Sequence, residues 1–449
     1  MLAVSVSVVV PAYNSSSDLR QCLPALVRSL PRALEIIVVD DASTDETSSV
    51  ASQHGATVIR LARNSGPAAA RNAGGRAACG DIVFFVDADV VVAPDAIGRV
   101  LRAFETDAEL AAVFGSYDRR PRAPGLVSQY RNLLHHYVHQ TGNPEASTFW
   151  GGCGAIRRSV FLEIGGFDAA RFSRPSIEDI ELGHRLRAAG HRIRLDRELQ
   201  ATHLKRWRLL SVIRTDVTSR AIPWARLILS SRYFPNDLNL KWDQRVSAGL
   251  VGVAGLLVLV APLRTELLAV AAFVVAAVVV LNRGWFAFLR RERGIGFAFA
   301  CVPLHLLYYL YSGLSFAYVY HEAVDEMESR SPERLTEIFR DAFPKLDRVA
   351  LGTAVGLTCG FSLLLATLFL VVKGGDIVGP NLALLAQYFP GYTVTATGSL
   401  IGFLYGFIAG FAGGWIMAFL RNASVFVVFV AASQSRTERR LMRKLLEYV

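Results

Sequence analysis

The composition of this chain changes sharply at Ser247, and the change limits the folds open to it. Residues 1–246 carry charged side chains throughout, as a globular domain does, whereas long apolar segments follow. Of the 449 residues, 52% are hydrophobic, which is a high share for a purely soluble protein. Because about 20 apolar residues suffice to cross a bilayer as a helix, we expect a globular domain followed by membrane helices.

Short apolar runs alternate with helical stretches through the first part of the chain. The candidate strands are Val4–Val10, Ile36–Val39, Thr57–Leu61, Ile82–Val86 and Ala111–Phe114. We expect helices between them, over residues 19–30, 45–53, 67–78 and 94–106. Strands that alternate with helices predict a parallel, doubly wound α/β sheet. The G-x-G-x-x-G pattern does not follow the first strand, which argues against a hydride-transferring Rossmann enzyme.

The charge distribution and the cysteine content argue against several classes of protein. The formal net charge is +10, but many basic residues lie beside apolar segments, such as Arg290, Arg291, Arg293 and the tail 436–444. This placement favours an anionic membrane surface over a nucleic acid as the partner. The five cysteines are far apart, which disfavours a disulfide framework or a zinc site. No charged leader precedes the first strand, so we expect the globular domain to lie in the cytosol.

The apolar segments after Ser247 predict a helical membrane region. Residues 247–262 and 267–281 are predicted to form a hairpin of two spans, and residues 349–372 and 394–420 two further spans. Glycines recur every few residues in the last of these segments, a spacing that lets helices pack closely in lipid.

A fifth apolar segment, 295–320, contains His305 and several tyrosines. We predict that it lies in the membrane interface, because five spans would place the basic tail outside, against the positive-inside rule. The expected organisation has four parts. They are a globular domain (1–230), an interfacial segment with the hairpin and the third apolar segment (231–320), a charged linker (321–348) and a C-terminal membrane module with a basic tail (349–449).

Two aspartates follow the most apolar of the predicted strands. Asp87 and Asp89 come directly after Ile82–Val86, and side chains two residues apart in an extended chain share a face. The carboxyl ends of strands are where open α/β sheets bind ligands. Two hard oxygen ligands that face one point suit a divalent cation such as Mg²⁺ or Mn²⁺, which could in turn hold a substrate diphosphate.

Five pieces of the sequence, in the same order, resemble the motifs of the family 2 glycosyltransferases, whose catalytic domain has the GT-A fold. The pieces are Val8–Asn14, Val39–Asp45, Gly66–Asn72, Asp87–Asp89 and Glu178–Asp179. The resemblance covers roughly residues 4–230. It implies an α/β domain that binds a nucleotide-sugar donor together with Mn²⁺ or Mg²⁺.

For the donor, the resemblance implies that Asp41 contacts the nucleobase or ribose, in a slot that is also lined by Pro11, Ala12, Tyr13 and Asn14. The alternative is that Asp41 only caps the helix that follows. Arg71 lies one turn into a helix whose N-terminus would attract a phosphate, so it could reach that phosphate. The alternative is an exposed arginine on a small-residue helix.

For the metal, the resemblance implies that Asp89 is a direct ligand. Asp87, the other acid of the metal motif, would contact the ribose or a metal-bound water. His203 would complete the metal site or touch the diphosphate, although a lone histidine of this kind is often structural.

For the transfer, the resemblance implies that Asp179 is the catalytic base, because an acceptor hydroxyl must lose its proton. Glu178 would position the acceptor. The alternative is that both acids are only favoured by the dipole at a helix start. Trp150 precedes a run of glycines that allows close approach of a ligand, so it could stack on a sugar or cover the acceptor; otherwise it lies in a buried turn.

The chain departs from the Q-x-x-R-W pattern of the processive polymer synthases. Arg206 and Trp207 are present, but His203 stands in place of the glutamine, so processive synthesis is not expected. Basic residues and tryptophans continue over residues 206–226, a composition that suits a helix in the membrane interface.

We therefore expect a metal-dependent, inverting glycosyltransferase that moves a sugar from a nucleotide-sugar donor to a lipid or lipid-linked acceptor. It would be integral to the bacterial inner membrane, with the catalytic domain in the cytosol and no nucleic-acid partner. Two alternatives stay open. One is a polyprenyl-phosphate sugar transferase, whose phosphate acceptor needs little help from a base. The other is a non-catalytic membrane scaffold that only binds a nucleotide sugar.

Overall fold

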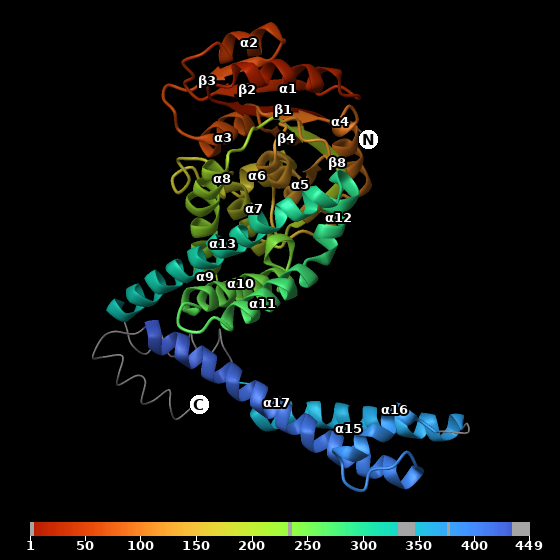
Figure 1. Ribbon diagram of the computed structural model, residues 1–449. Helices are drawn as coiled ribbons and strands as arrows, with labels where there is room; N and C mark the ends of the chain where they lie inside the picture. The colour runs from red at the N-terminus through yellow and green to blue at the C-terminus, as the bar shows by residue number, and fades with distance from the viewer. Residues whose placement is uncertain (1–3, 232–235, 331–345, 375–377, 433–449) are drawn as a thin grey trace. The chain divides into compact units, whose positions relative to one another are not determined.

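The computed structural model describes residues 4–231, 236–330, 346–374 and 378–432 (Figure 1). The chain divides into two compact units, Met1–Tyr320 and His321–Val449. The first contains an α/β domain and a group of helices that follow it, and the second contains a helical hairpin. The boundary between the units falls where the charged linker was predicted to begin.

An eight-stranded sheet forms the centre of the α/β domain, with the strand order β3-β2-β1-β4-β7-β6-β8-β5. The strands are β1 (Val6–Ala12), β2 (Glu35–Asp40), β3 (Thr57–Arg60), β4 (Ile82–Val86), β5 (Val90–Val92), β6 (Leu110–Tyr117), β7 (Cys153–Arg157) and β8 (Arg192–His203). The four strands β3, β2, β1 and β4 are parallel, as are β6 and β8. β7 runs antiparallel to both of its neighbours, and β5 to β8. The α/β prediction is confirmed, but the sheet is mixed, and each antiparallel pair includes at least one strand (β5, β7 or β8) that the sequence did not indicate.

Helices cover both faces of this sheet, as Figure 1 shows for α1 and α3. One face carries α1 (Ser16–Arg28), α2 (Thr47–Gln53) and α4 (Ala96–Thr106), and the other carries α3 (Pro67–Ala77), α6 (Arg158–Glu163) and α7 (Glu178–Ala188). Side chains of a strand alternate between the two faces. Val8 and Val10 of β1 accordingly lie in the first core, and Val9 lies in the second. The four predicted helices are all present.

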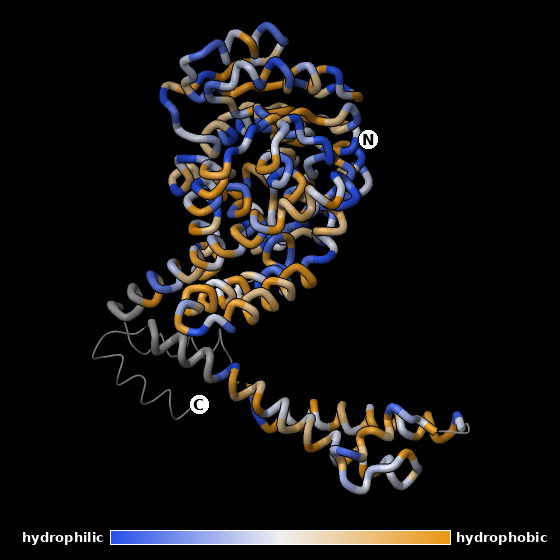
Figure 2. Tube along the Cα trace, viewed as in Figure 1, coloured by the Kyte–Doolittle hydropathy of each residue, from blue (hydrophilic) through white to orange (hydrophobic). Residues whose placement is uncertain are grey.

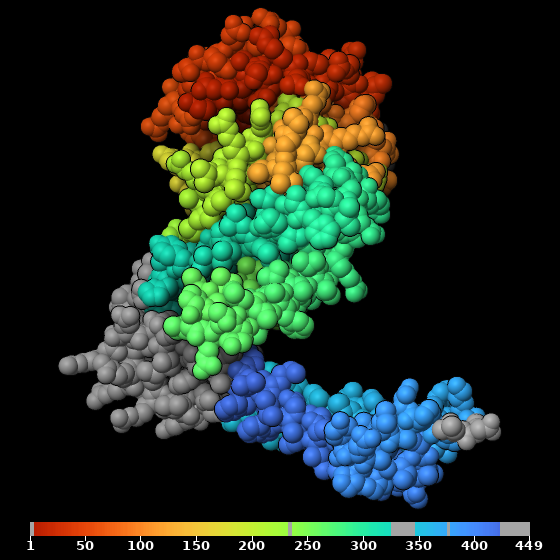
Figure 3. Space-filling model, in the orientation of Figure 1, coloured from red at the N-terminus to blue at the C-terminus, as the bar shows by residue number. Residues whose placement is uncertain are grey.

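Further helices complete the first unit, and the last of them continues past its end at Tyr320. They are α5 (Leu126–Thr141), α8 (Leu209–Asp216), the π-helical turn η1 (Val217–Ala221), α9 (Ile222–Ser231), the short η2 (Leu238–Leu240), α10 (Trp242–Val260), α11 (Leu267–Leu281), α12 (Arg283–Arg293) and α13 (Ile295–Arg330). α10 and α11 form the predicted hairpin. α12 and the start of α13 pack on α5 through Trp285, Phe288 and Cys301, so they lie directly against the α/β domain (Figure 3).

Four helices of the described residues are long and apolar enough to cross a membrane. They are Trp242–Val260, Ile295–Val324, Arg348–Lys373 and Ala396–Asn422, and Figure 2 shows their hydrophobic character. α11 is shorter and would add a fifth span only if it were counted together with α12, from which it is bent by 71°.

The segment 295–320 therefore differs from the interfacial helix that we predicted, since by length and composition it is a candidate span. Its polar side chains have protein partners on the α/β side. His305 Nδ1 lies 2.9 Å from the hydroxyl of Tyr130, and the hydroxyl of Tyr311 donates to Asp216 at 2.7 Å. These contacts explain the polar residues of this segment without a membrane boundary.

The second unit is built from α15 (Arg348–Lys373) and α17 (Ala396–Ala432), joined through α16 (Pro380–Ala383) and η3 (Leu384–Gln387). The two long helices pack through their glycines. A Cβ on Gly356 would lie 2.8 Å from the carbonyl oxygen of Phe407, and a Cβ on Gly406 would lie 3.0 Å from that of Cys359. The predicted close packing is therefore present. The basic tail 436–444 and most of the charged linker lie outside the described residues.

Candidate active site

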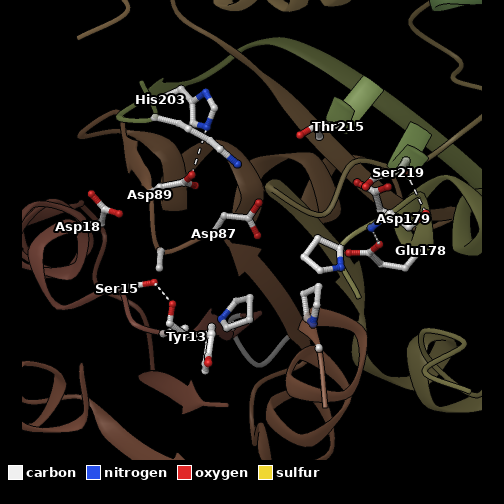
Figure 4. Close-up of a pocket in the computed structure, with 18 of the residues that line it drawn as sticks. Tyr13, Ser15, Asp18, Asp87, Asp89, Glu178, Asp179, His203, Thr215 and Ser219 are labelled. Atoms are coloured by element: carbon white, nitrogen blue, oxygen red, sulfur yellow. Dashed lines mark hydrogen bonds and ion pairs between the residues drawn. The ribbon is translucent and has the colours of Figure 1, made fainter. Parts of the chain in front are cut away.

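A cavity of about 450 Å³ opens at the carboxyl ends of β1, β2 and β4 (Figure 4). It is lined by every predicted site residue except Asn14. The lining members are Pro11, Ala12, Tyr13, Asp41, Arg71, Asp87, Asp89, Trp150, Glu178, Asp179 and His203. Residues from widely separated parts of the chain thus meet in one place.

Asn14 ties together the two loops that form one wall of this cavity. Its backbone N–H donates to Ser43 Oγ at 2.9 Å, and its Oδ1 accepts from the backbone N–H of Thr44 at 2.8 Å. Asn14 has a φ of 48°, in the left-handed region that asparagine tolerates better than most residues. Its observed role is to shape the loop, and the predicted contact with a nucleotide would be indirect.

Asp41 is buried at the end of β2 and holds the start of α3. Its Oδ1 accepts from the backbone N–H of Ser65 at 2.7 Å, and its Oδ2 accepts from that of Gly66 at 2.8 Å. Burial raises the pKa of Asp41. The neighbouring Asp40, not Asp41, stabilises the turn after β2, since it accepts from the backbone N–H of Ser43 at 2.8 Å. Asp41 therefore does not cap the helix that follows β2, which was its alternative, but both of its oxygens hold the backbone that leads into α3.

Arg71 is buried between two carboxylates and is not the exposed side chain of the alternative interpretation. Its Nη2 donates to Asp87 Oδ1 at 2.6 Å, and its Nη1 donates to Glu178 Oε1 at 2.9 Å. Arg71 thus joins the two acidic motifs of the site. Both ends of its guanidinium are already paired, so the structure gives it a positioning role toward these acids.

Asp89 and His203 face each other across the cavity. His203 Nε2 lies 3.3 Å from Asp89 Oδ2, and His203 Nδ1 lies 2.7 Å from Asn132 Oδ1. The imidazole also stacks on the ring of Tyr117, with 4.5 Å between the centroids. Burial pushes the pKa of Asp89 up, but the hydrogen bond with His203 and the charge of Lys205 outweigh it and lower this pKa. These contacts hold the imidazole beside the carboxylate and favour the ionised form of Asp89.

Asp179 and Glu178 are the first residues of α7. Asp179 Oδ2 accepts from the backbone N–H of Gly151 at 3.0 Å, and its Oδ1 accepts from that of Ile180 at 2.8 Å. Burial, followed by the charge of Glu178, raises the pKa of Asp179 to about 6. Glu178 Oε2 accepts from the backbone N–H of Ser176 at 2.8 Å. Asp179 therefore has the proton affinity that a general base needs near neutral pH.

Trp150 forms a partly exposed aromatic wall and does not lie in a buried turn. Its ring contacts those of Tyr117 and His135, each with 4.8 Å between the centroids. A Cβ on Gly152 would lie 2.8 Å from the indole, so only glycine leaves room for this ring position. The exposed part of the ring lines the cavity and could stack on a sugar.

Several further residues line the cavity that the sequence did not single out. Asp18 is one of them, and burial together with the charge of Asp89 raises its pKa. The others include Tyr117, Arg131, Asn132, His135, Lys205, Thr215, Ser219 and Arg220. Arg131 and His135 are four residues apart in α5, so they share a face of the helix, and this spacing is a signal that could have indicated a polar face.

The α/β fold and the grouped acids define a ligand-binding enzyme domain, and its sequence matches a known family. Residues 7–165 match the model of the family described as Glycosyl transferase family 2. Residues 7–165 of this chain are therefore similar to the family 2 glycosyltransferases.

Individual relatives agree with this assignment. An uncharacterized glycosyltransferase of Haemophilus influenzae is 29% identical over 176 residues, covering 36% of this chain and 56% of the relative. A validoxylamine A glucosyltransferase of Streptomyces hygroscopicus subsp. limoneus is 30% identical, covering 44% of this chain and 51% of the relative. A pre-mycofactocin glycosyltransferase of Mycobacterium tuberculosis is 33% identical, covering 42% and 41%. This chain thus spans about half the length of these curated relatives.

Among solved structures, a mannosyltransferase from Pyrobaculum calidifontis in complex with GDP-Man and Mn²⁺ aligns with this chain. The alignment covers 70% of this chain and 88% of the other, with a TM-score of 0.46 and 20% sequence identity.

Proposed function

We propose that this protein is a metal-dependent, inverting glycosyltransferase that moves a sugar from a nucleotide sugar to a membrane-associated acceptor. The observation that carries the proposal is the single cavity lined by Asp41, Asp89 and Asp179, which come from three separate parts of the chain. The family match and the names of the relatives support sugar transfer as the reaction class.

The nucleotide of the donor fits the end of the cavity beside β1 and β2. Pro11, Ala12 and Tyr13 line this end, and the Tyr13 side chain is 48% exposed, which leaves its ring available for stacking. Each oxygen of the Asp41 carboxylate has accepted one backbone hydrogen bond and can accept another. Asp41 can therefore bind a nucleobase imide or a ribose hydroxyl.

A divalent cation fits at Asp89 and His203, with Asp87 beside them. His203 Nδ1 lies 2.7 Å from Asn132 Oδ1, and its Nε2 lies 3.3 Å from Asp89 Oδ2, so Asn132 orients the imidazole toward the carboxylate. The Asp89 carboxylate lines the cavity and its pKa is lowered by its surroundings, so it can ligate a cation, with His203 beside it.

No three His, Cys, Asp or Glu side chains of the described part of the chain lie close enough to hold a metal by themselves. One or two carboxylates that act together with substrate phosphates suit Mg²⁺ or Mn²⁺. When bound, the cation would neutralise the charge that develops on the leaving diphosphate.

Asp179 acts as the base toward the acceptor. With a pKa of about 6, its carboxylate is mostly ionised at neutral pH and still basic enough to take the proton of a hydroxyl. Arg71 pairs with both Asp87 and Glu178, so it fixes the distance between the donor side and the acceptor side of the cavity. The acceptor oxygen attacks the anomeric carbon opposite the leaving diphosphate, which inverts the configuration there.

A membrane-associated acceptor is supported by the helices of the same unit. α10 and the first part of α13 are candidate spans. The start of α8 exposes Leu209 and Leu210, the latter by 80%, next to the exposed basic residues Arg206 and Arg208. An apolar tip surrounded by basic side chains suits insertion into an anionic membrane surface. In this proposal the protein is integral to the membrane and its catalytic domain lies on the cytosolic side.

A thermal-shift screen of nucleotide sugars tests the donor and the metal together, with the full chain in nonionic detergent. One class of donor should raise the melting temperature in the presence of Mn²⁺ and not in the presence of a chelator, because a ligand of the native state stabilises it. Asp89→Asn should lose this shift. Asp95→Asn, which changes an exposed aspartate outside the cavity, should keep it. A shift that is unchanged by chelation, or the absence of nucleoside diphosphate release with membrane lipid extracts, would contradict the proposal.

A further inference from the structure

A second cavity, of about 470 Å³, lies between α4 and β8, away from the active-site cavity that holds Asp89 and Asp179. α4 and β8 lie side by side (Figure 1). The last residue of β8, His203, lines the active-site cavity, whereas residues 194–198 of the same strand line the second cavity. Among the residues that the structure describes, the two cavities have no lining residue in common.

Positive charge is in excess in the second cavity. Four arginines line it, together with only two acids, Asp196 and Glu198. Asp196 Oδ2 lies 3.7 Å from Arg99 Nη1, and Arg99 also pairs with Asp95 outside the cavity at 2.8 Å. The other three arginines have no ion pair within the described parts of the chain. They are Arg102, Arg194 and Arg197.

Two of these arginines are held by the backbone through a single hydrogen bond each. Arg194 Nη2 donates to the carbonyl oxygen of Ala103 at 2.8 Å, and Arg197 Nη2 donates to that of Gly142 at 2.7 Å. A guanidinium group has five N–H donors. Arg197 Nε is buried and has no hydrogen-bond partner among the described residues. Because a buried donor without a partner is unfavourable, an acceptor that binds in this cavity would be stabilised there.

An irregularity in β8 carries part of this charge out of the sheet. Phe114 of β6 pairs with Leu195, and Ser116 of β6 pairs with Gln200, so residues 196–199 of β8 lie opposite a single residue of β6. Extra residues of this kind bend a strand and redirect its side chains. The irregularity includes Arg197, so the local backbone presents this arginine to the cavity and not to a neighbouring strand.

The lining indicates a phosphate group without a nucleobase as the ligand. Guanidinium groups bind phosphate through paired hydrogen bonds, and the cavity offers them from both of its walls. The remaining lining residues that the structure describes contain no aromatic ring on which a base could stack. They are Ala103, Thr106, Pro144 and Leu195.

The chain beside this cavity leads directly into a candidate membrane helix. Arg197 donates to Gly142, and the carbonyl oxygen of the preceding Thr141 accepts from Lys241 Nζ at 2.5 Å. The next residue, Trp242, is the first of a candidate span, and its side chain is 66% exposed. Tryptophan and basic residues are typical of the headgroup level of a bilayer. The second cavity therefore lies beside the point where this helix would enter the membrane.

We propose that the second cavity binds the phosphate of an anionic phospholipid headgroup and so holds the α/β domain against the membrane surface. The excess of arginines favours an anionic lipid over a zwitterionic one, whose headgroup cation would be repelled. This site is separate from the active-site cavity, and its binding requires neither a sugar donor nor a metal.

Native mass spectrometry of the full chain in nonionic detergent tests the proposal with three probes at equal concentration. These are phosphatidylglycerol, phosphatidylcholine and glycerol 1-phosphate. The bound fraction should be about fivefold higher or more with phosphatidylglycerol than with phosphatidylcholine, which carries a cation, or with glycerol 1-phosphate, which is not anchored in the micelle.

Variants assign this binding to the second cavity. Arg102→Glu and Arg197→Gln should each lower the bound fraction of phosphatidylglycerol by about fivefold or more. Arg102 is exposed and has no ion pair in the described part of the chain, so its replacement leaves the fold intact. Arg197→Lys keeps the charge and should bind more phosphatidylglycerol than Arg197→Gln. Arg76→Gln changes an exposed arginine of α3 outside both cavities and is the matched control, with binding unchanged.

Three results would overturn the proposal. Equal binding of phosphatidylcholine and phosphatidylglycerol would remove the role of charge. Equal binding of glycerol 1-phosphate would assign the cavity to a soluble anion. A loss in Arg76→Gln as large as that in Arg102→Glu, or no loss in Arg102→Glu, would show that the bound lipid does not occupy this cavity.

Discussion

Replacing Arg71 by methionine tests whether one buried guanidinium holds the acids of the site in place. Its side chain is 5% exposed and pairs with Asp87 at 2.6 Å and with Glu178 at 2.9 Å. Removing one partner of a buried ion pair costs about 3–5 kcal/mol, because the other charge stays buried without compensation. Glu178 is 6% exposed and incurs this cost, whereas Asp87 is 32% exposed and is largely screened by water. We expect the α/β domain to lose about 3–4 kcal/mol of stability.

Thermal unfolding of the full chain in detergent measures this loss. For a domain of this size, 1 kcal/mol corresponds to about 2–4 °C, so the unfolding transition of the α/β domain should fall by roughly 6–15 °C. Arg76→Met changes an exposed arginine on the same helix and is the matched control, with an effect within about 0.5 kcal/mol.

A second variant separates the charge from the packing. Adding Glu178→Gln to Arg71→Met removes the buried charge that was left unpaired and should recover part of the lost stability. If Arg71→Met cost less than about 1 kcal/mol, or if adding Glu178→Gln recovered none of the loss, the buried ion-pair network would not be what holds these acids.

The remaining predictions concern the base and the helical hairpin. Asp179→Asn should reduce sugar transfer by at least about a hundredfold and leave nucleotide binding intact, as expected for loss of a general base. In the unaltered protein the rate should fall as pH drops below about 6, because the raised pKa of Asp179 means that its carboxylate is protonated there; a rate that is flat between pH 5 and 7 would refute this role. Gly356→Ala should destabilise the hairpin of α15 and α17 by about 1–3 kcal/mol through overpacking, measured as faster proteolysis between these helices. Gly413→Ala, with nothing within 4 Å of the added Cβ, should have little effect, and equal effects of the two would contradict the packing argument.

Much of the site could be predicted from the sequence because its acids follow recognisable strands. The run Ile82–Val86 forms β4, and Asp87 and Asp89 follow it at the edge of the sheet where the cavity opens. Asp41 follows β2 in the same way. The carboxyl ends of neighbouring parallel strands lie at one edge, so local patterns were enough to bring these residues together. The roles of the individual residues in binding and catalysis stay predictions.

Strands without a clear apolar run could not be found in this way. β8 alternates charged and apolar residues over Arg192–His203, and β5 contains only three residues. Both depend on pairing with strands from distant parts of the chain, so their own residues carry little signal. The sequence also indicated an interfacial helix at 295–320. Polar residues within an apolar segment give the same sequence pattern whether they face a membrane boundary or contact another part of the protein, so the sequence could not separate the two cases.

Only the tertiary structure shows which charged side chains of the site form ion pairs with one another. The sequence indicated that Arg71 lies at a helix start, but its pairing with Glu178 joins residues 107 positions apart. The shared use of Asp216 by Arg131 and Arg220 likewise follows no local pattern, since it arises where α5 and η1 meet. Sequence periodicity reports the preferences of neighbours along the chain, and it determined the domain type and the location of the acidic motifs. Charge balance in a cavity depends on which distant groups fold against one another, and only the tertiary structure shows that here.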